Sequence, residues 1–158
     1  MRLLLILALI WLFGTCRSGA SELPSDVEWT TWTNAAAGYS LEVPDVYEAA
    51  VEDDGNAVFF RWGGTVPTKV YLTDLESAKR HGLWVDEEPA GPTTLAGQSG
   101  TRYDYTHCDG PFCSRVTSFI IARGDRWLAL EFRSGGELGT VNQRILASFT
   151  VLPAGPGD

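Results

Sequence analysis

The sequence predicts an α+β domain in which a mainly antiparallel β-sheet is flanked by helices. Three observations support this fold class. Strand-like segments follow one another with short turn signals between them, which is typical of antiparallel hairpins. Two segments carry helix start signals, and one of them continues into a helical apolar stripe. Two neighbouring strands near the end of the chain carry apolar side chains on both faces, which indicates a central position in a covered sheet.

The composition is that of one globular domain. The chain has 158 residues, of which 44% are hydrophobic and 20% are charged, and this excludes a collagenous fibre or a coiled coil. Twelve basic residues against 20 acidic ones give a net charge of -8. Because so acidic a surface repels phosphate backbones, we expect no nucleic-acid partner.

Residues 1–20 are predicted to be a secretory signal peptide. Arg2 supplies the positive start, and the apolar run from Leu3 to Phe13 is too short to span a bilayer as a helix. Two cleavage sites compete. Cleavage after Ala20 gives a secreted chain. The segment that ends at Cys16 instead resembles a bacterial lipobox, in which cleavage would leave Cys16 lipidated, although Thr15 fits that motif poorly. The expected location is the bacterial periplasm or the extracellular space, with membrane contact only through a lipid on Cys16.

The first half of the chain contains several strand signals and one helix signal. Residues 39–43 alternate apolar and polar side chains up to Pro44, and Asp54-Gly55 is a hairpin turn signal. Residues 28–33 are predicted to be a lead-in or an edge strand, and further strands are predicted at 39–43, 46–52, 57–62 and 69–72. Thr73 and Glu76 have the spacing of a capping box, and Gly82 suits the end of that helix. Residues 86–92 are predicted to be a loop.

The second half predicts three strands and a closing helix. The strands are 101–107 with a bent lead-in from Thr93, then 114–122 and 126–133, with a tight turn at Gly124-Asp125. In the last strand Leu128, Leu130 and Phe132 share one face, and Trp127, Ala129 and Glu131 share the other.

The closing helix is predicted from a second capping box, Ser134 with Glu137. Its apolar stripe is Leu138, Val141, Ile145 and Phe149. We therefore expect a polar lead-in at 21–37, a single domain at 38–152 and a disordered tail at 153–158.

Cys108 and Cys113 are predicted to form a disulfide. An exported chain meets an oxidising compartment, where an even pair of cysteines most simply forms a bridge. The segment between them, Asp-Gly-Pro-Phe, contains residues that favour turns, so the bridge would close the tip of a β-hairpin. The alternatives are a redox pair, which normally has Cys-x-x-Cys spacing, and a zinc site, which needs more ligands than His107 adds. We therefore predict neither a metal nor a cofactor.

The order of motifs resembles that of the Mog1/PsbP-like domains, including bacterial secreted proteins and lipoproteins of the DUF1795 and DcrB type. The matching segments are 38–44, 95–100 leading into the strand at 103–105, 127–132 and 145–149. The resemblance implies an α/β/α sandwich around an antiparallel sheet. It also implies a non-enzymatic role, such as an assembly factor, adaptor or binding partner, and it brings no catalytic residues.

The residues themselves offer little catalytic chemistry. Gly97-Gln98-Ser99-Gly100 superficially resembles a serine-nucleophile turn, but residue 101 is Thr and a strand follows instead of a helix. A hydrolase would need Ser99 or a carboxylate near His81 or His107. The structural interpretation of His81 is that it lies at the C-terminal end of a helix and interacts with the helix dipole. Solvated turns explain the acidic runs 52–56 and 86–88.

Aromatic residues mark the candidate binding surface. Tyr103, Tyr105 and His107 share one strand face that leads to the hairpin tip with Phe112, and Trp62 is a further candidate. The alternative is that these aromatic side chains fill a small core. We expect a non-enzymatic domain that binds another cell-envelope protein. The alternative function is a small-molecule or glycan binder with a pocket between sheet and helix.

Overall fold

The computed structural model of the chain describes residues 23–24, 26–134 and 137–153. The predicted signal peptide 1–20 therefore lies outside the described residues, and Cys16 lies outside them with it. Of the tail predicted at 153–158, only Pro153 is described.

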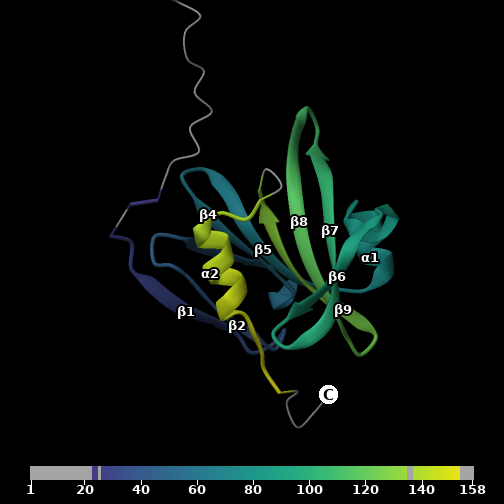
Figure 1. Ribbon diagram of the computed structural model, residues 1–158, viewed down its shortest axis with the longest axis horizontal. Coiled ribbons are helices and arrows are strands. Elements are labelled where there is room, and N and C mark those ends of the chain that lie inside the picture. Colours follow the sequence, from purple (N-terminus) through teal and green to yellow (C-terminus); the bar gives the residue numbers. More distant parts are fainter. Residues whose placement is uncertain (1–22, 25, 135–136, 154–158) are drawn as a thin grey trace, which may run out of the picture.

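Within the described residues, seven strands form one antiparallel sheet in the order β3-β4-β5-β9-β8-β7-β6 (Figure 1). Their bounds are β3 Glu48–Glu52, β4 Ala57–Trp62, β5 Thr65–Thr73, β6 Pro89–Leu95, β7 Gln98–Asp109, β8 Phe112–Arg123 and β9 Arg126–Arg133. A smaller antiparallel sheet has the order β1-β2-β10, with bounds Trp29–Asn34, Tyr39–Pro44 and Thr150–Val151. These strands confirm the predicted α+β class.

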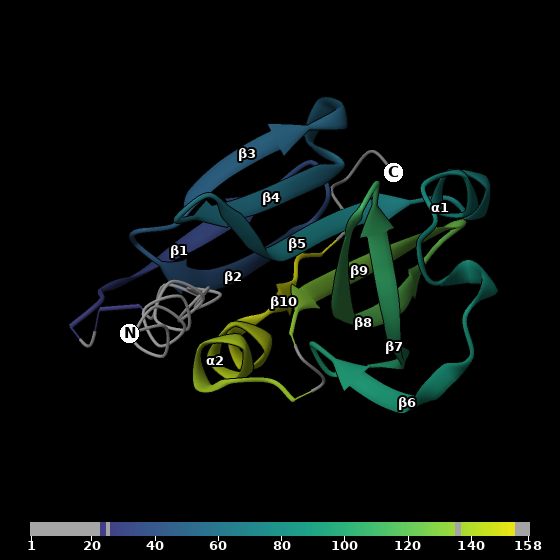
Figure 2. The same ribbon diagram turned by 90° about the horizontal axis from the view of Figure 1, so that it is seen from above.

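Two short helices cover opposite faces of the large sheet. Helix α2 (Thr140–Ser148) lies on one face together with the small sheet, and helix α1 (Leu75–Arg80) lies on the other (Figure 2). We call these faces the α2 face and the α1 face. Two 3-10 turns, η2 (Asp53–Gly55) and η3 (Trp84–Asp86), follow β3 and α1. No helix in the described part of the chain is long and apolar enough to cross a membrane.

Each face of the large sheet has its own apolar core. The core on the α2 face includes Leu128, Leu130 and Phe132 with Ile145 of α2. The core on the α1 face is smaller; its buried members are Tyr71, Ala78, Trp84, Tyr105, Val116, Ile120 and Ala129. The alternation predicted for the last strand is therefore confirmed, because its two sets of side chains enter two different cores.

Both predicted capping boxes are wrong. The N-cap of α1 is Asp74, whose side chain accepts a hydrogen bond from the backbone N–H of Ser77 at 2.7 Å. The N-cap of α2 is Gly139, because Ser134 still belongs to the sheet region: its backbone N–H donates to the carbonyl of Arg115 at 3.1 Å. Tertiary hydrogen bonds thus override the local capping pattern at Ser134.

The predicted loop 86–92 and the bent lead-in from Thr93 are also corrected. Strand β6 begins at Pro89, and it tolerates two prolines because it is an edge strand of the sheet. Between β6 and β7 the chain reverses at Ala96 and Gly97, whose φ values are both positive at 51° and 75°. Two successive positive φ angles are the signature of a tight hairpin turn, so the lead-in is a separate strand.

Candidate binding groove and stapled hairpin

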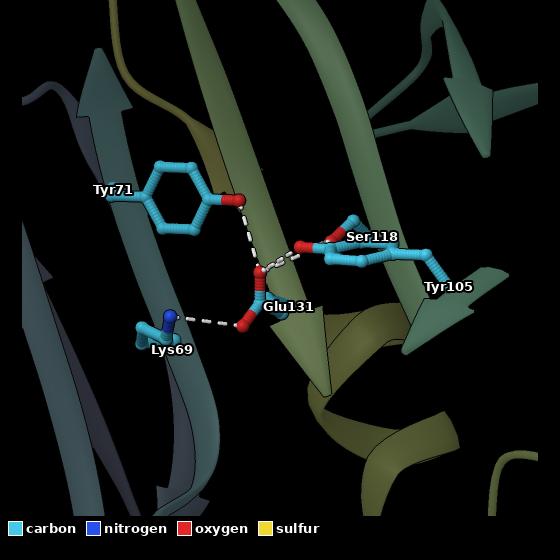
Figure 3. A network of polar contacts seen from close by, with 5 residues as sticks. All are labelled: Lys69, Tyr71, Tyr105, Ser118 and Glu131. Atoms are coloured by element: carbon cyan, nitrogen blue, oxygen red, sulfur yellow. Dashed lines mark hydrogen bonds and ion pairs between the residues drawn. The ribbon is translucent and has the colours of Figure 1, made fainter. Parts of the chain in front are cut away.

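A buried carboxylate, Glu131 of β9, lies at the centre of a polar cluster on the α1 face (Figure 3). Its Oε1 lies 3.0 Å from Nζ of Lys69. Its Oε2 accepts hydrogen bonds from Tyr71 at 3.0 Å, Tyr105 at 2.8 Å and Ser118 at 3.3 Å. Glu131 is 2% exposed, and these contacts satisfy it from three strands: β5 and β8, which flank β9, and β7, the next strand beyond β8.

The cluster holds Glu131 ionised and its tyrosine partners protonated. Burial on its own raises the pKa of Glu131, but the Lys69 charge and the hydrogen bonds from Lys69, Tyr105 and Tyr71 together lower it below its ordinary value. Burial, followed by the negative charge of Glu131, raises the pKa of Tyr71 and of Tyr105 well above 10.0. The tyrosine hydroxyls and the Lys69 ammonium are therefore donors, and the Glu131 carboxylate is their shared acceptor. This arrangement holds the donor side chains in place.

A groove of about 600 Å³ lies over this cluster, between β5 and α1. Its floor includes Phe59, Lys69 and Tyr71. Nζ of Lys69 lies 5.7 Å from the ring centroid of Phe59 and 5.5 Å from that of Tyr71, so the two rings flank the ammonium group. The volume falls in the range of small-molecule sites.

The groove is lined by both acidic and basic residues. Glu52 and Asp53, at the end of β3 and in η2, contribute carboxylates. Arg80 and His81 at the end of α1 and His107 of β7 contribute a guanidinium and two imidazoles. Among the described residues, the side chains of Arg80, His81 and His107 make no hydrogen bond or ion pair. The groove thus presents polar groups available for a ligand.

The end of the β7–β8 hairpin projects beyond the rest of the sheet (Figure 1). The last pair of β8 with β9 is Val116 with Arg133, and the last pair of β7 with β6 is Tyr103 with Pro89. In the described part of the chain, the strand pairing of residues 106–115, which we call the ribbon, runs between its own two sides, and Ser134 adds a backbone hydrogen bond to Arg115.

A disulfide between Cys108 and Cys113 joins directly opposite positions of the ribbon, with the Cα atoms 4.0 Å apart. The predicted bridge and its place at a hairpin tip are therefore present in the structure. Both cysteines are exposed. The ribbon is thus a stapled two-stranded element that contributes few side chains to either core.

The structure separates the residues predicted to form one aromatic surface. Tyr105 is 6% exposed and bound to Glu131, so it belongs to the core and does not contribute an exposed ring. Tyr103 is half-buried, with its ring centroid 6.5 Å from that of Trp84. His107 is half-buried and reaches the groove. The side chain of Phe112 lies outside the described part of the structure.

Trp62 lies apart from the other predicted surface residues. It lines two other hollows, one of which it shares with Thr140 and Val141 of α2. Trp62 is separated from the others because β4 and β7 are distant in the order of the sheet. The sequence does not specify this strand order, so it gave no indication of the separation.

Ser99 does not approach the histidines in the way a hydrolase needs. It lies eight residues before His107 on the same strand, which is about 27 Å at a rise of 3.4 Å per residue. It is also absent from the described residues that line the groove, which include both His81 and His107.

Lys69, Glu131 and Arg80 were not among the residues singled out from the sequence. One signal existed for Glu131: it is a lone carboxylate in the otherwise apolar run Trp127–Phe132. A charge at such a position predicts a buried partner, but alternation alone cannot say which strand supplies it.

The fold is similar to that of solved structures with very different sequences. No family model matches the chain, and no curated protein matches it. A protein of Bacteroides thetaiotaomicron matches with a TM-score of 0.53 at 10% identity over 81% of this chain, which spans about half (49%) of that protein. The PsbP protein of the cyanobacterium Synechocystis, CyanoP, matches with a TM-score of 0.52 at 10% identity, covering 89% of this chain and 99% of CyanoP.

A third structure, LpqN of Mycobacterium tuberculosis, is described as involved in cell envelope biogenesis. It matches with a TM-score of 0.44 at 14% identity over 81% of this chain and 92% of LpqN. At that score the similarity supports no inference about this chain. The similarity to CyanoP establishes a PsbP-like fold for this chain, in agreement with the fold that the sequence motifs implied.

Proposed function

We propose that this protein is an exported, non-catalytic domain that binds another protein of the cell envelope through its stapled ribbon. The resemblance to lipoproteins of the DUF1795 and DcrB type and the alternative of a lipid anchor on Cys16 are parts of the same proposal. The observation that supports the proposal is the ribbon, because it forms a disulfide-bonded strand pair that extends beyond both apolar cores.

A two-stranded ribbon without neighbouring strands has little stability of its own. An isolated two-stranded hairpin is only marginally stable in water, and residues 106–115 have almost no neighbouring strands. The Cys108–Cys113 bridge offsets this deficit by restricting the unfolded chain, which contributes about 2 kcal/mol for so short a loop. A ribbon ordered in advance loses less conformational entropy when a partner binds to it.

The test replaces residues 108–113 by Asn-Gly, so that a two-residue turn joins His107 to Ser114. The two cysteines form a close pair, so the neighbouring pair His107 and Ser114 is hydrogen-bonded and a two-residue turn can join it. We expect this variant to melt at nearly the same temperature as the natural protein and to lose its partner. It retains His107 in the groove, so the effect is specific to the tip.

Partner contact is measured by placing a photocrosslinking amino acid at Thr106 and, in a matched control, at Asp125. Both sites are exposed, and Asp125 lies in the turn at the opposite end of β8. A specific crosslinked species in the native envelope from Thr106 alone supports the proposal. Equal products from both sites, or partner capture that survives the Asn-Gly replacement, contradict it.

A second function, binding of a small molecule between sheet and helix, is supported by the groove between β5 and α1. Its test is ligand-dependent thermal stabilisation, since a ligand that binds only the folded state raises the melting temperature.

A further inference from the structure

The groove combines side chains suited to one kind of ligand. Arg80 presents a guanidinium with five donors in a planar fork, which matches the geometry of a carboxylate. The imidazoles of His81 and His107 add donors that, within the described residues, have no other hydrogen-bonding partner. All three side chains line the same groove, so each is available to an anionic group bound there.

The floor beneath these donors suits a flat apolar body. Phe59 is partly exposed, and Leu83 and Ala57 continue the apolar lining beside it. The Lys69 ammonium at the floor is engaged by Glu131 at 3.0 Å, so it does not compete as a free anion site. The floor therefore offers ring faces and aliphatic surface, which favour burial of a planar ligand.

The acidic residues of the groove limit the charge that the ligand can carry. Glu52 lies 3.5 Å from Arg61, which partly balances it, but Asp53 adds a second negative charge close by. The whole chain also has a net charge of -8. Repulsion from these groups disfavours polyanions such as phosphorylated chains and leaves a single negative charge as the best match.

We infer that the groove binds a small monocarboxylate with a planar apolar body, its carboxylate on Arg80, His81 and His107 and its body over Phe59. This inference rests on the second proposed function, small-molecule binding, and specifies its ligand class. It is independent of partner binding by the ribbon.

The experiment compares three probes that share one planar body and differ in charge. These are indole-3-acetate, the neutral indole-3-acetamide and the cationic tryptamine, titrated at millimolar concentrations into the full chain. Binding is followed by chemical-shift changes of the arginine and histidine side chains in nuclear magnetic resonance spectra. We expect saturable binding of indole-3-acetate at least roughly tenfold tighter than that of the other two probes, as one charge-assisted bidentate contact provides.

Two matched variants test whether the carboxylate of the probe binds at Arg80. Arg80→Gln and Lys79→Gln each remove one exposed positive charge from the same helix, but only Arg80 lines the groove. We expect Arg80→Gln to weaken indole-3-acetate binding roughly tenfold and Lys79→Gln to have little effect. An equal effect of both variants would mean that only the general field of the helix acts, and it would overturn the inference.

The other outcomes separate this inference from the function on which it rests. Equal or tighter binding of indole-3-acetamide or tryptamine preserves small-molecule binding but overturns the selectivity for a carboxylate. Failure of all three probes to saturate overturns the inference. The crosslinking result at Thr106 is unaffected by either outcome.

Discussion

At the scale of single residues, Glu131 shows how a buried charge is accommodated in this sheet. A carboxylate that is 2% exposed is costly unless it is paired and hydrogen-bonded. Here Lys69 balances the charge, and three hydroxyl groups satisfy the remaining oxygen. Removing one member of such a pair leaves the other charge uncompensated, which strongly destabilises the folded state.

The lowered pKa of Glu131 predicts an acid-dependent contribution to stability. The unfolded chain takes up this proton near the ordinary pKa of 4.5, whereas the folded protein resists protonation to lower pH. The contribution is therefore present above pH 4.5 and is lost as the pH falls below it. In Glu131→Gln, melting temperatures measured across this range should fall less steeply with acid than in the natural protein.

The matched control for this measurement is Glu48→Gln, which removes an exposed carboxylate from β3. It should retain the steep acid dependence. An unchanged dependence in Glu131→Gln would show that other carboxylates dominate the acid response.

Gly100 is a second position where one residue decides the local geometry. A Cβ atom at this position would overlap the carbonyl oxygen of Ile120 on the neighbouring strand. The glycine therefore permits close contact between β7 and β8. This explains structurally why the motif at 95–100 ends in a glycine, which lies inside β7 near its start.

At the scale of elements, the β7–β8 hairpin has two parts with different support. Residues up to Tyr105 and from Val116 onward belong to the large sheet and its cores, whereas the ribbon at 106–115 depends mainly on its own pairing and its disulfide. Local opening of the ribbon therefore need not open the sheet.

We predict that the double variant Cys108→Ser, Cys113→Ser loses order only in the ribbon. Amide hydrogen exchange should accelerate at 106–115 and stay unchanged at 116–122, because only the former segment lacks neighbouring strands. Reduction of the natural protein with a small thiol serves as a control and should give the same pattern. Accelerated exchange across β9 would contradict this division.

The helices show a similar difference between local and tertiary control. Helix α1 has a local N-cap, Asp74, one residue after the predicted position. Helix α2 has no side-chain cap, and its position depends on contacts with β2: the Oγ of Ser148 accepts a hydrogen bond from the backbone N–H of Glu42 at 2.9 Å. This tertiary contact therefore holds the C-terminal end of α2 against β2.

At the scale of the whole molecule, the two faces of the large sheet are unequally covered. The small sheet and α2 cover one face with a large apolar core, while α1 and η3 provide a smaller cover on the other (Figure 2). The groove over the Glu131 cluster lies on the less covered face. The architecture thus places the stabilising core and the candidate ligand site on opposite sides of one sheet.

Phe149 should be important for the integrity of the whole domain. It is 2% exposed, and its ring stacks on that of Tyr39 with centroids 5.5 Å apart, which joins the end of the chain to β2. We predict that Phe149→Ala lowers the free energy of unfolding by about 3–5 kcal/mol, measured by urea denaturation. Leu146→Ala in α2, the helix that ends just before Phe149, is the control, and because Leu146 is only partly buried its replacement should cost less. Equal losses would contradict the role assigned to Phe149.

Side-chain alternation and turn residues within short segments predicted much of the fold. The alternation at Tyr39–Val43, the turn at Gly124-Asp125 and the two-faced strand Arg126–Arg133 are local patterns, and each is present in the structure. The turn at Ala96-Gly97 was not predicted, because a positive φ at a non-glycine residue has no clear sequence signal. The caps were predicted wrongly for a similar reason, since a sequence pattern allows several helix starts and tertiary contacts select one.

The sequence by itself determined the α+β class, the faces of the last strands and the Cys108–Cys113 pair, because periodicity, turn chemistry and cysteine spacing act over a few residues. Only the tertiary structure decided that Tyr105 is buried and that Trp62 lies apart. It also decided that Lys69, Arg80 and His107 line one groove, with Glu131 buried against Lys69. These residues come from different strands and a helix. Their meeting depends on strand order and sheet packing, which no local pattern in the chain specifies.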